Sequence, residues 1–307
     1  GIFMEGSKPA MEYRYLGNSG VRVSVLSFGN WLNSRKEGDY ELTRDCIKKM
    51  YDSGVNFYDT AEIYGDGAAE EMLGKVFKEL NLPREELVVS TKIKQIGPGV
   101  NDQFLSRKHI VEGLKNSLKR LQLDYVDVIF CHRADYEVSL EETCHALHFV
   151  IEQGWAFYWG TSEWAPDLIA SAIEYCDKMN LHKPITEQPL YNMFRREKFE
   201  KHYRFVFEKQ KIGSTVWSPL AGGLLTGKYN DGNVPVGTRF DQHKDQTGGI
   251  WNQYMGEKNR ATTLAKFNKL ADLAKELGYS QAQLALAWVI ASRDVSTAIL
   301  GFTRVTQ

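Results

Sequence analysis

The sequence of 307 residues contains few cysteines and no long hydrophobic segment. Its four cysteines lie far apart and form no Cys-x-x-Cys pair, which argues against a disulfide framework and a zinc ribbon. No run of about 18 apolar residues exists, and the first residues carry no secretion signal, so we expect no membrane insertion. Dispersed cysteines and the lack of a signal together predict a cytoplasmic location.

The sequence also lacks an excess of charge of either sign. Lys and Arg number 38 and Asp and Glu number 39, so the net charge is -1. This balance gives no electrostatic reason to expect a nucleic acid or an anionic membrane as the main partner. Two Cys-His pairs, at residues 131–132 and 144–145, fall on a predicted strand and within a predicted helix, so no metal site is expected. We therefore expect a small or neutral partner.

Apolar residues, 43% of the chain, follow an alternating pattern. A Gly-Asn-Ser-Gly turn at residues 17–20 predicts a β-hairpin near the start. Short apolar runs then predict strands at residues 25–28, 56–59, 87–91, 125–130, 156–160, 185–188, 214–217 and 297–300. Helical spacing is found at residues 39–53, 68–80, 106–121, 139–153, 166–179, 199–209, 262–277 and 280–292. Strand alternating with helix eight times is typical of the (β/α)8 TIM barrel, an α/β fold.

No interior linker divides the chain, so one barrel is expected over residues 11–307. Residues 1–10 are expected to be a tag or a disordered terminus. The repeat also predicts that the C-terminal helix after the last strand is missing. Residues 218–259 are predicted to be a long loop, because they are rich in glycine and contain Pro219 and Pro235. Loops of this size in a compact domain are usually lids or clamps.

Polar or aromatic side chains stand where six consecutive predicted strands end. They are Asp59, Lys92, His132, Thr161 with Ser162, Gln188, and Trp217 with Ser218. TIM barrels carry their active sites at this end of the strands, so we expect these side chains to share one rim. Tyr64 follows Asp59 by five residues in a glycine-containing loop and is expected to fold over the same rim.

Four of these residues together suit the reduction of a carbonyl group. A phenol with a pKa of about 10 is a poor proton donor at neutral pH, and a nearby ammonium such as Lys92 would lower the pKa of Tyr64. Asp59 would keep Lys92 charged, and His132 would orient the carbonyl oxygen. The hydride must come from a cofactor. Each residue taken singly also has a purely structural interpretation. Asp59 could cap a turn, Lys92 could be solvated at a strand end, His132 could lie in the core and Tyr64 could stand in a surface turn.

No complete dinucleotide fingerprint follows any strand, since Glu70 stands where the third glycine of G-x-G-x-x-G belongs. Residues 222–228 match G-x-x-x-x-G-K, but Tyr229 replaces the Ser or Thr of a P-loop. What remains is a glycine-rich loop suited to binding a diphosphate through backbone N–H groups. Lys228, Arg239 and Arg304 could pair with a 2′-phosphate, and solvated loop charges are the alternative.

Several motifs resemble the aldo-keto reductase superfamily. They are NFYDTAEIYG at residues 56–65, VVSTK at 88–92 and YVDVIFCHR at 125–133. Residues 106–110, 157–162, 191–194 and 217–221 resemble the branch that contains the voltage-gated potassium channel beta subunits. The resemblance covers nearly the whole chain and implies a (β/α)8 barrel, NADPH/NADP+ as cofactor and oligomerisation, with a homotetramer as the candidate state. It also implies a catalytic tetrad at Asp59, Tyr64, Lys92 and His132.

The same resemblance implies which residues contact the cofactor. They are Trp31, Ser162, Gln188, Trp217, Ser218, Pro219, Leu220, Gly222, Lys228, Arg239, Gly301, Thr303 and Gln307. Animal channel subunits commonly carry Asn at the position of His132. This chain keeps the His of ordinary reductases, and that His favours competent catalysis. Glu163 stands where many reductases carry Asn and animal channel subunits carry Arg, and the charge argument does not explain an acidic group there.

The function expected from these features is NADPH-dependent reduction of an aldehyde or ketone to an alcohol, with Tyr64 as the proton donor. The aromatic residues Trp31, Tyr64 and Trp164 indicate an apolar pocket and a hydrophobic or aromatic carbonyl substrate. The alternative is a cofactor-sensing regulatory subunit that binds the cytosolic domain of a potassium channel and turns over slowly or not at all.

Overall fold

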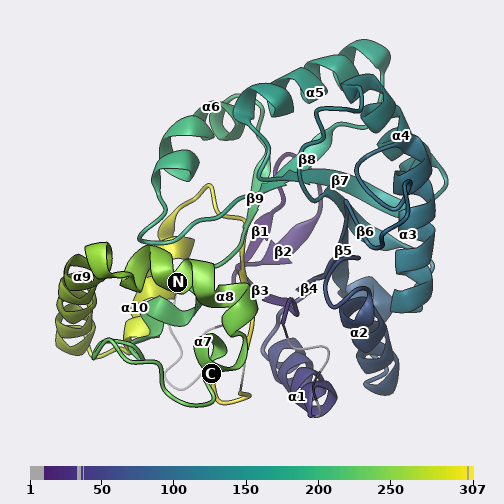
Figure 1. Cartoon of the computed structure of the whole chain (residues 1–307). Coiled ribbons are helices and arrows are strands. Elements are labelled where there is room, and N and C mark those ends of the chain that lie inside the picture. Colours follow the sequence, from purple (N-terminus) through teal and green to yellow (C-terminus); the bar gives the residue numbers. More distant parts are fainter. Residues whose placement is uncertain (1–9, 33–35, 37, 303) are drawn as a thin grey trace, which may run out of the picture.

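Eight parallel strands close into a barrel in a computed structural model that describes residues 10–32, 36, 38–302 and 304–307 (Figure 1). The strands are β3 (Leu26–Gly29), β4 (Phe57–Asp59), β5 (Val88–Ile93), β6 (Val126–Cys131), β7 (Ala156–Ser162), β8 (Pro184–Gln188), β9 (Gly213–Val216) and β10 (Thr297–Leu300). They neighbour one another in chain order, and β10 pairs with both β9 and β3 to close the barrel. The expected (β/α)8 fold is confirmed.

Helices form a ring outside the barrel (Figure 1). They include α1 (Asp39–Asp52), α2 (Ala68–Glu79), α3 (Arg107–Leu121), α4 (Leu140–Glu152), α5 (Pro166–Met179), α6 (Arg204–Glu208) and α10 (Gln281–Ala291), with a short 3-10 turn η1 (Arg84–Glu86) before β5. Each of the first four helices buries an apolar face against the strands, as shown by the fully buried Ile47, Leu73, Leu114 and Leu147. Within the described residues, none of the helices is both long enough and apolar enough to cross a bilayer.

The N-terminal hairpin closes one end of the barrel. β1 (Tyr13–Tyr15) and β2 (Arg22–Ser24) pair antiparallel, as predicted. The turn between them lies so close to the starts of β8 and β9 that a Cβ on Gly17, whose φ is +64°, would lie 2.3 Å from the carbonyl oxygen of Ile185. The hairpin and the strands share an apolar floor, which consists of Leu16, Val23, Phe57, Val88, Val128, Phe130, Ile185 and Ile299.

The segment after β9 corrects the prediction of a long loop at residues 218–259. It contains the 3-10 turn η3 (Ala221–Thr226) and the helices α7 (Arg239–Gln242) and α8 (Lys244–Met255), and α9 (Glu257–Glu276) begins before residue 262. The physical reason is burial, because the segment packs around its own core, here called the outer cluster. Its buried members are Ala221, Leu224, Leu225, Tyr229, Phe240, Met255, Phe267 and Ala285.

The predicted helix at residues 199–209 is also divided. A π-helical turn, η2 (Lys198–His202), precedes the short α6. Tyr203 stands between them, and its hydroxyl donates to the carbonyl oxygen of Trp164 at 2.6 Å. This contact places a buried side chain at the break between the two helical turns.

Candidate active site

The ends of β4 and β5 bring Asp59 and Lys92 together in a buried ion pair. Lys92 Nζ donates to Asp59 Oδ2 at 2.5 Å and to the carbonyl oxygen of Thr60 at 2.7 Å. The exposed fractions of the two side chains are only 0% for Lys92 and 4% for Asp59. The other carboxylate oxygen of Asp59 accepts from Ser90 Oγ at 2.7 Å and from Gln188 Nε2 at 3.1 Å. Lys92 is therefore not a solvated strand end, and Asp59 is fixed by groups from β5 and β8.

Tyr64 and His132 lie against this pair. Lys92 Nζ is 4.7 Å from the centroid of the Tyr64 ring, and the rings of Tyr64 and His132 meet edge to face with centroids 5.7 Å apart. His132 is fixed beside β5 because its backbone N–H donates to the carbonyl oxygen of Ile93 at 3.1 Å. The four side chains expected at one rim thus form one contiguous group.

The protonation states of this group follow from burial and from its charges. Burial raises the pKa of Tyr64 above its usual 10, although the Lys92 ammonium acts in the opposite direction. The sequence predicted that Lys92 would lower the pKa of Tyr64, but burial outweighs this effect. The phenol therefore keeps its proton. Burial acts to lower the pKa of Lys92, but the charge and hydrogen bond of Asp59 together with Tyr64 more than offset it, so the pKa is raised and Lys92 stays an ammonium. Burial, together with Lys92 and Arg133, holds the pKa of His132 well below 6.5, so its imidazole is neutral.

Ser162 and Gln188, at the ends of β7 and β8, are joined to each other and to the ion pair. Ser162 Oγ donates to the carbonyl oxygen of Gln188 at 3.0 Å and accepts from Arg133 at 3.1 Å. The side-chain amide of Gln188 donates to Asp59 and, at 3.3 Å, to Thr215 Oγ1. These two predicted cofactor contacts are thus in the same hydrogen-bonded network as Asp59 and Lys92.

Glu163 has partners that sequence reasoning missed. Its backbone has a left-handed φ of 58°, and its carboxylate accepts from the backbone N–H of Leu190 at 2.5 Å and from the indole N–H of Trp217 at 3.1 Å. Lys198 Nζ donates to the same carboxylate at 2.7 Å and supplies the balancing charge. The carboxylate of Glu163, for which the sequence offered no explanation, therefore fixes the indole of Trp217. Lys198 is 35 residues away along the chain, and no local pattern could have identified it.

The glycine-rich loop after β9 has an unusual backbone. Ser218, Ala221, Gly222 and Gly223 all have positive φ, and only the last two lack a side chain that opposes it. The bonds that fix the loop include one from the N–H of Gly222 to Ser218 Oγ and one from Asn192 Nδ2 to the carbonyl oxygen of Ser218, both 3.0 Å long. The N–H groups of Ala221 and Gly223 also donate within the loop, to the carbonyl oxygens of Ser218 and Leu220. Pro219 is buried and Leu220 is half-buried in the same loop. A backbone of this kind can direct N–H groups at an anion.

Three cations lie beyond this loop and are here called the cationic cluster: Lys228, Arg239 and Arg304. Burial lowers the pKa of Lys228, and the charges of Arg239 and Arg304 lower it further, so both arginines lie near Lys228. Within the described part of the chain, no carboxylate forms an ion pair with any of them. Neighbouring cations without a carboxylate fit an anionic ligand such as a phosphate.

The remaining predicted contacts lie at the end of the chain or after β3. A Cβ on Gly301 would lie 2.9 Å from Arg239 Nη2, so Gly301 borders the cationic cluster. The N–H of Gln307 donates to the carbonyl oxygen of Arg304 at 3.3 Å. Trp31 follows β3 and is 41% exposed. Thr303 lies outside the described residues.

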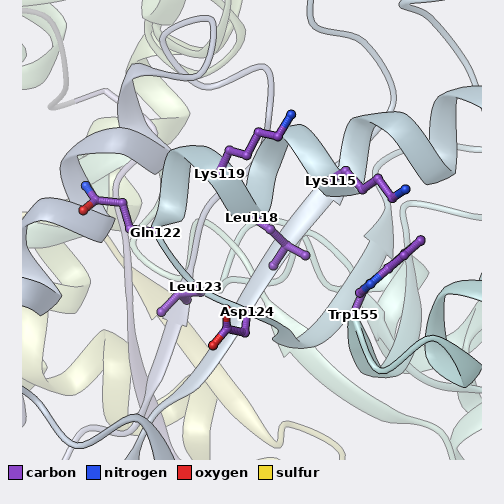
Figure 2. A pocket seen from close by; sticks show the side chains of 7 residues that line it. All are labelled: Lys115, Leu118, Lys119, Gln122, Leu123, Asp124 and Trp155. Carbon is purple, nitrogen blue, oxygen red and sulfur yellow. The ribbon is translucent and has the colours of Figure 1, made fainter.

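A surface hollow of about 420 Å³ lies elsewhere (Figure 2). Its lining comes from the end of α3 and from the residues before β6 and β7, namely Lys115, Leu118, Lys119, Gln122, Leu123, Asp124 and Trp155. These residues precede their strands, whereas Lys92 and Gln188 stand at strand ends. The hollow is therefore at the opposite end of the barrel from the group around Tyr64.

Comparison with known proteins defines the class to which this fold and site belong. Residues 25–307 match the Aldo/keto reductase family, and the chain belongs to this family. It is 47% identical over 300 residues to a protein of Arabidopsis thaliana named a probable voltage-gated potassium channel subunit beta, covering 97% of this chain and 89% of the relative. A rice protein with the same name is 45% identical over 300 residues, again 97% of this chain and 89% of the relative. A putative beta subunit of Schizosaccharomyces pombe is 44% identical over 299 residues, which are 96% of this chain and 85% of the relative.

Proposed function

We propose that this protein is an NADPH-dependent reductase that converts aldehydes or ketones to alcohols. The observation that carries the proposal is the buried Asp59–Lys92 ion pair beneath a protonated Tyr64 and beside a neutral His132. Membership of the aldo/keto reductase family supports it, because these proteins generally bind NADP(H).

In this proposal NADPH would extend from the tetrad to the cationic cluster. Ser162 and Gln188 would hold the nicotinamide amide, and Trp217 would stack on its ring with Trp31 nearby. The backbone of residues 218–223 would bind the diphosphate. Lys228, Arg239 and Gln307, with Gly301 beside them, would hold the 2′-phosphate and adenine. When bound, NADPH supplies the hydride that the carbonyl carbon receives.

The side chains of the tetrad would handle the proton. The neutral imidazole of His132 donates a hydrogen bond that orients the carbonyl oxygen. As negative charge develops on that oxygen, the phenol of Tyr64 gives it a proton and becomes a phenolate. The Lys92 ammonium stabilises this phenolate, and Asp59 keeps Lys92 charged and in place.

Replacing the proton donor tests the proposal. Tyr64→Phe should lower the rate of NADPH consumption with aromatic aldehydes by about 10²–10⁴-fold, while the Kd for NADPH, measured by fluorescence titration, changes little. Tyr136→Phe is the matched control, because Tyr136 is 79% exposed in the loop after β6. Equal turnover by wild type and Tyr64→Phe would contradict the assignment of the donor. Failure of the wild type to bind NADPH would contradict the cofactor.

A second candidate function is supported by the names of the relatives at 44–47% identity. As a regulatory subunit, the protein would bind NADPH and the cytosolic domain of a potassium channel and would reduce carbonyls slowly or not at all. It would then be a cytoplasmic protein and, in this proposal, a homotetramer. Tight NADPH binding without turnover on any carbonyl, together with co-purification with a channel domain, would favour this function. Light scattering of the purified protein would measure the oligomeric state.

A further inference from the structure

Two histidines and a glutamate meet on the outside of the barrel. His148 and Glu152 are four residues apart near the end of α4, so their side chains share one face of the helix. His182 comes from the segment between α5 and β8, and its Nε2 lies 2.8 Å from Glu152 Oε1. One ligand atom of each residue lies within 4.8 Å of those of the other two. His182 precedes β8, so the group stands at the opposite end of that strand from Gln188.

The backbone of His182 is fixed by two bonds. Its N–H donates to His148 Nδ1 at 3.3 Å, and its carbonyl oxygen accepts from the indole of Trp159 at 2.7 Å. Trp159 is fully buried in β7, so the second bond ties this segment to the barrel. The rings of His148 and His182 face each other with centroids 4.9 Å apart and an interplanar angle of 34°. The three side chains therefore converge from anchored backbone positions.

We propose that His148, Glu152 and His182 form a binding site for a divalent transition-metal ion, with Zn²⁺ as the best match. Two imidazoles and one carboxylate are a ligand set that zinc uses when its fourth position is open to water. Donors around a tetrahedral zinc lie about 3.3 Å apart, so small side-chain rotations would close the group on an ion. The side chains of His182 and Glu152 are 45% and 58% exposed, which gives the ion direct access from solvent.

The neighbouring titratable and cationic side chains have partners of their own. His145 itself lies 3.2 Å from the hydroxyl of Tyr175 and is engaged elsewhere. Lys183, the nearest lysine in sequence, pairs with Asp177 at 2.7 Å.

A bound ion would join the end of α4 to the chain that enters β8. Because an ion that binds only the folded state stabilises it, zinc at 100 times its Kd should raise Tm by about 4 °C. The site is separate from the tetrad, so the inference does not depend on the proposed reductase activity. Its test uses binding and stability alone.

The experiment titrates the EDTA-treated, purified full chain with Zn²⁺ in competition with a chromophoric chelator. We expect one saturable equivalent in the wild type and an affinity at least about tenfold lower in His148→Ala, Glu152→Gln and His182→Ala. Glu152→Gln keeps the size of the side chain, so its loss of affinity would not reflect misfolding. His202→Ala is the matched control, because His202 is an exposed histidine at the end of η2.

Thermal unfolding with and without zinc gives a second readout. The rise in Tm should occur in the wild type and His202→Ala and should be absent in His182→Ala. Equal zinc affinity in wild type and His182→Ala would overturn the proposal. Weak binding of several zinc ions that does not saturate, equal in all variants, would also overturn the proposal and would leave only the Glu152–His182 hydrogen bond.

Discussion

The two ends of the barrel differ in chemistry. The apolar floor at the hairpin end contains only hydrocarbon and aromatic side chains, such as Leu16 and Phe57. The rim at the other end buries the Asp59–Lys92 ion pair and the amide of Gln188. Burying charges is expensive unless every partner is present, whereas apolar burial is favourable in itself. The comparison indicates that the floor is built for stability and the rim for chemistry.

The largest effect should come from breaking the ion pair at the rim. Lys92→Met leaves the Asp59 carboxylate buried without its cation and should lower the free energy of unfolding by about 3–5 kcal/mol. It should also abolish measurable carbonyl reduction. Lys108→Met is the control, because Lys108 and Glu112 form an exposed pair worth about 0.5 kcal/mol or less. Urea unfolding measures the free energy of unfolding of both variants. An equal decrease in Lys92→Met and Lys108→Met would contradict the difference expected between a buried and an exposed ion pair.

A cavity in the apolar floor should reduce stability and spare chemistry. Leu16 is fully buried, so Leu16→Ala should lower the free energy of unfolding by about 2–5 kcal/mol. The KM and kcat of the folded fraction should stay close to those of the wild type. Leu277→Ala, at a 51% exposed leucine, should change neither quantity. A large fall in kcat for Leu16→Ala would show that the two ends are coupled.

The cationic cluster should affect cofactor choice rather than folding. Arg239→Met should weaken NADPH binding by about 10–100-fold, because a charge-assisted bond to phosphate is lost. Binding of NADH, which lacks the 2′-phosphate, should change much less. Arg293→Met, at an exposed arginine before β10, is the control. Equal weakening for both dinucleotides would argue against a 2′-phosphate at this cluster.

A buried carboxyl beside the rim should make stability depend on pH. Burial raises the pKa of Glu187 from 4.5 to about 7 against a hydrogen bond from Thr161. The folded state therefore binds the carboxyl proton of Glu187 more tightly than the unfolded state does. The stability that this proton contributes is complete below pH 4.5 and is lost as the pH rises to about 7. Glu187→Gln should remove about 1–3 kcal/mol of that fall between pH 5 and pH 8. Urea unfolding at both pH values measures this loss of stability, with Glu276→Gln at an exposed position as the control. An equal loss in the wild type, Glu187→Gln and Glu276→Gln would refute the prediction.

The smallest effect should come from the group that fixes Trp217. Glu163→Gln keeps an acceptor for the indole but loses the charge that pairs with Lys198, so the Kd for NADPH should rise by only about threefold. Glu163→Ala removes both interactions and should weaken binding further. Fluorescence titration distinguishes them, and unchanged affinity in both variants would mean that Glu163 does not position the indole for the cofactor.

Much of the barrel and its rim could be predicted from local pattern. Strand runs, helical spacing and the rule that sites lie at strand ends brought Asp59, Lys92 and His132 together without coordinates. The contacts that could not be predicted are those with residues that do not stand at a strand end, such as Lys198 in η2 and His182 before β8. Glu163 meets Lys198 across 35 residues, and His182 meets Glu152 across 30. Likewise, the direction of the pKa shift of Tyr64 depends on its burial, and residue spacing in the sequence does not reveal burial.

Residues 218–259 show a different limit. Glycines at 248 and 249 and Pro235 argue against helix in the sequence of α7 and α8. The apolar residues of these helices pack on each other and on Tyr229, and the same cluster extends to Phe267 of α9 and Ala285 of α10. Propensity favours a loop there, whereas tertiary burial favours helix, and burial prevails. A prediction from the segment alone could not include partners that come later in the chain.

The outer cluster has a consequence for how this protein can diversify. Its buried side chains pack around Tyr229 and Phe267 rather than around the barrel strands, so the segment forms a unit with a core of its own, which includes Ala221 of the glycine-rich loop. Substitutions within such a unit alter its opening without disturbing the barrel. The packing of this segment can therefore evolve separately from the group around Tyr64.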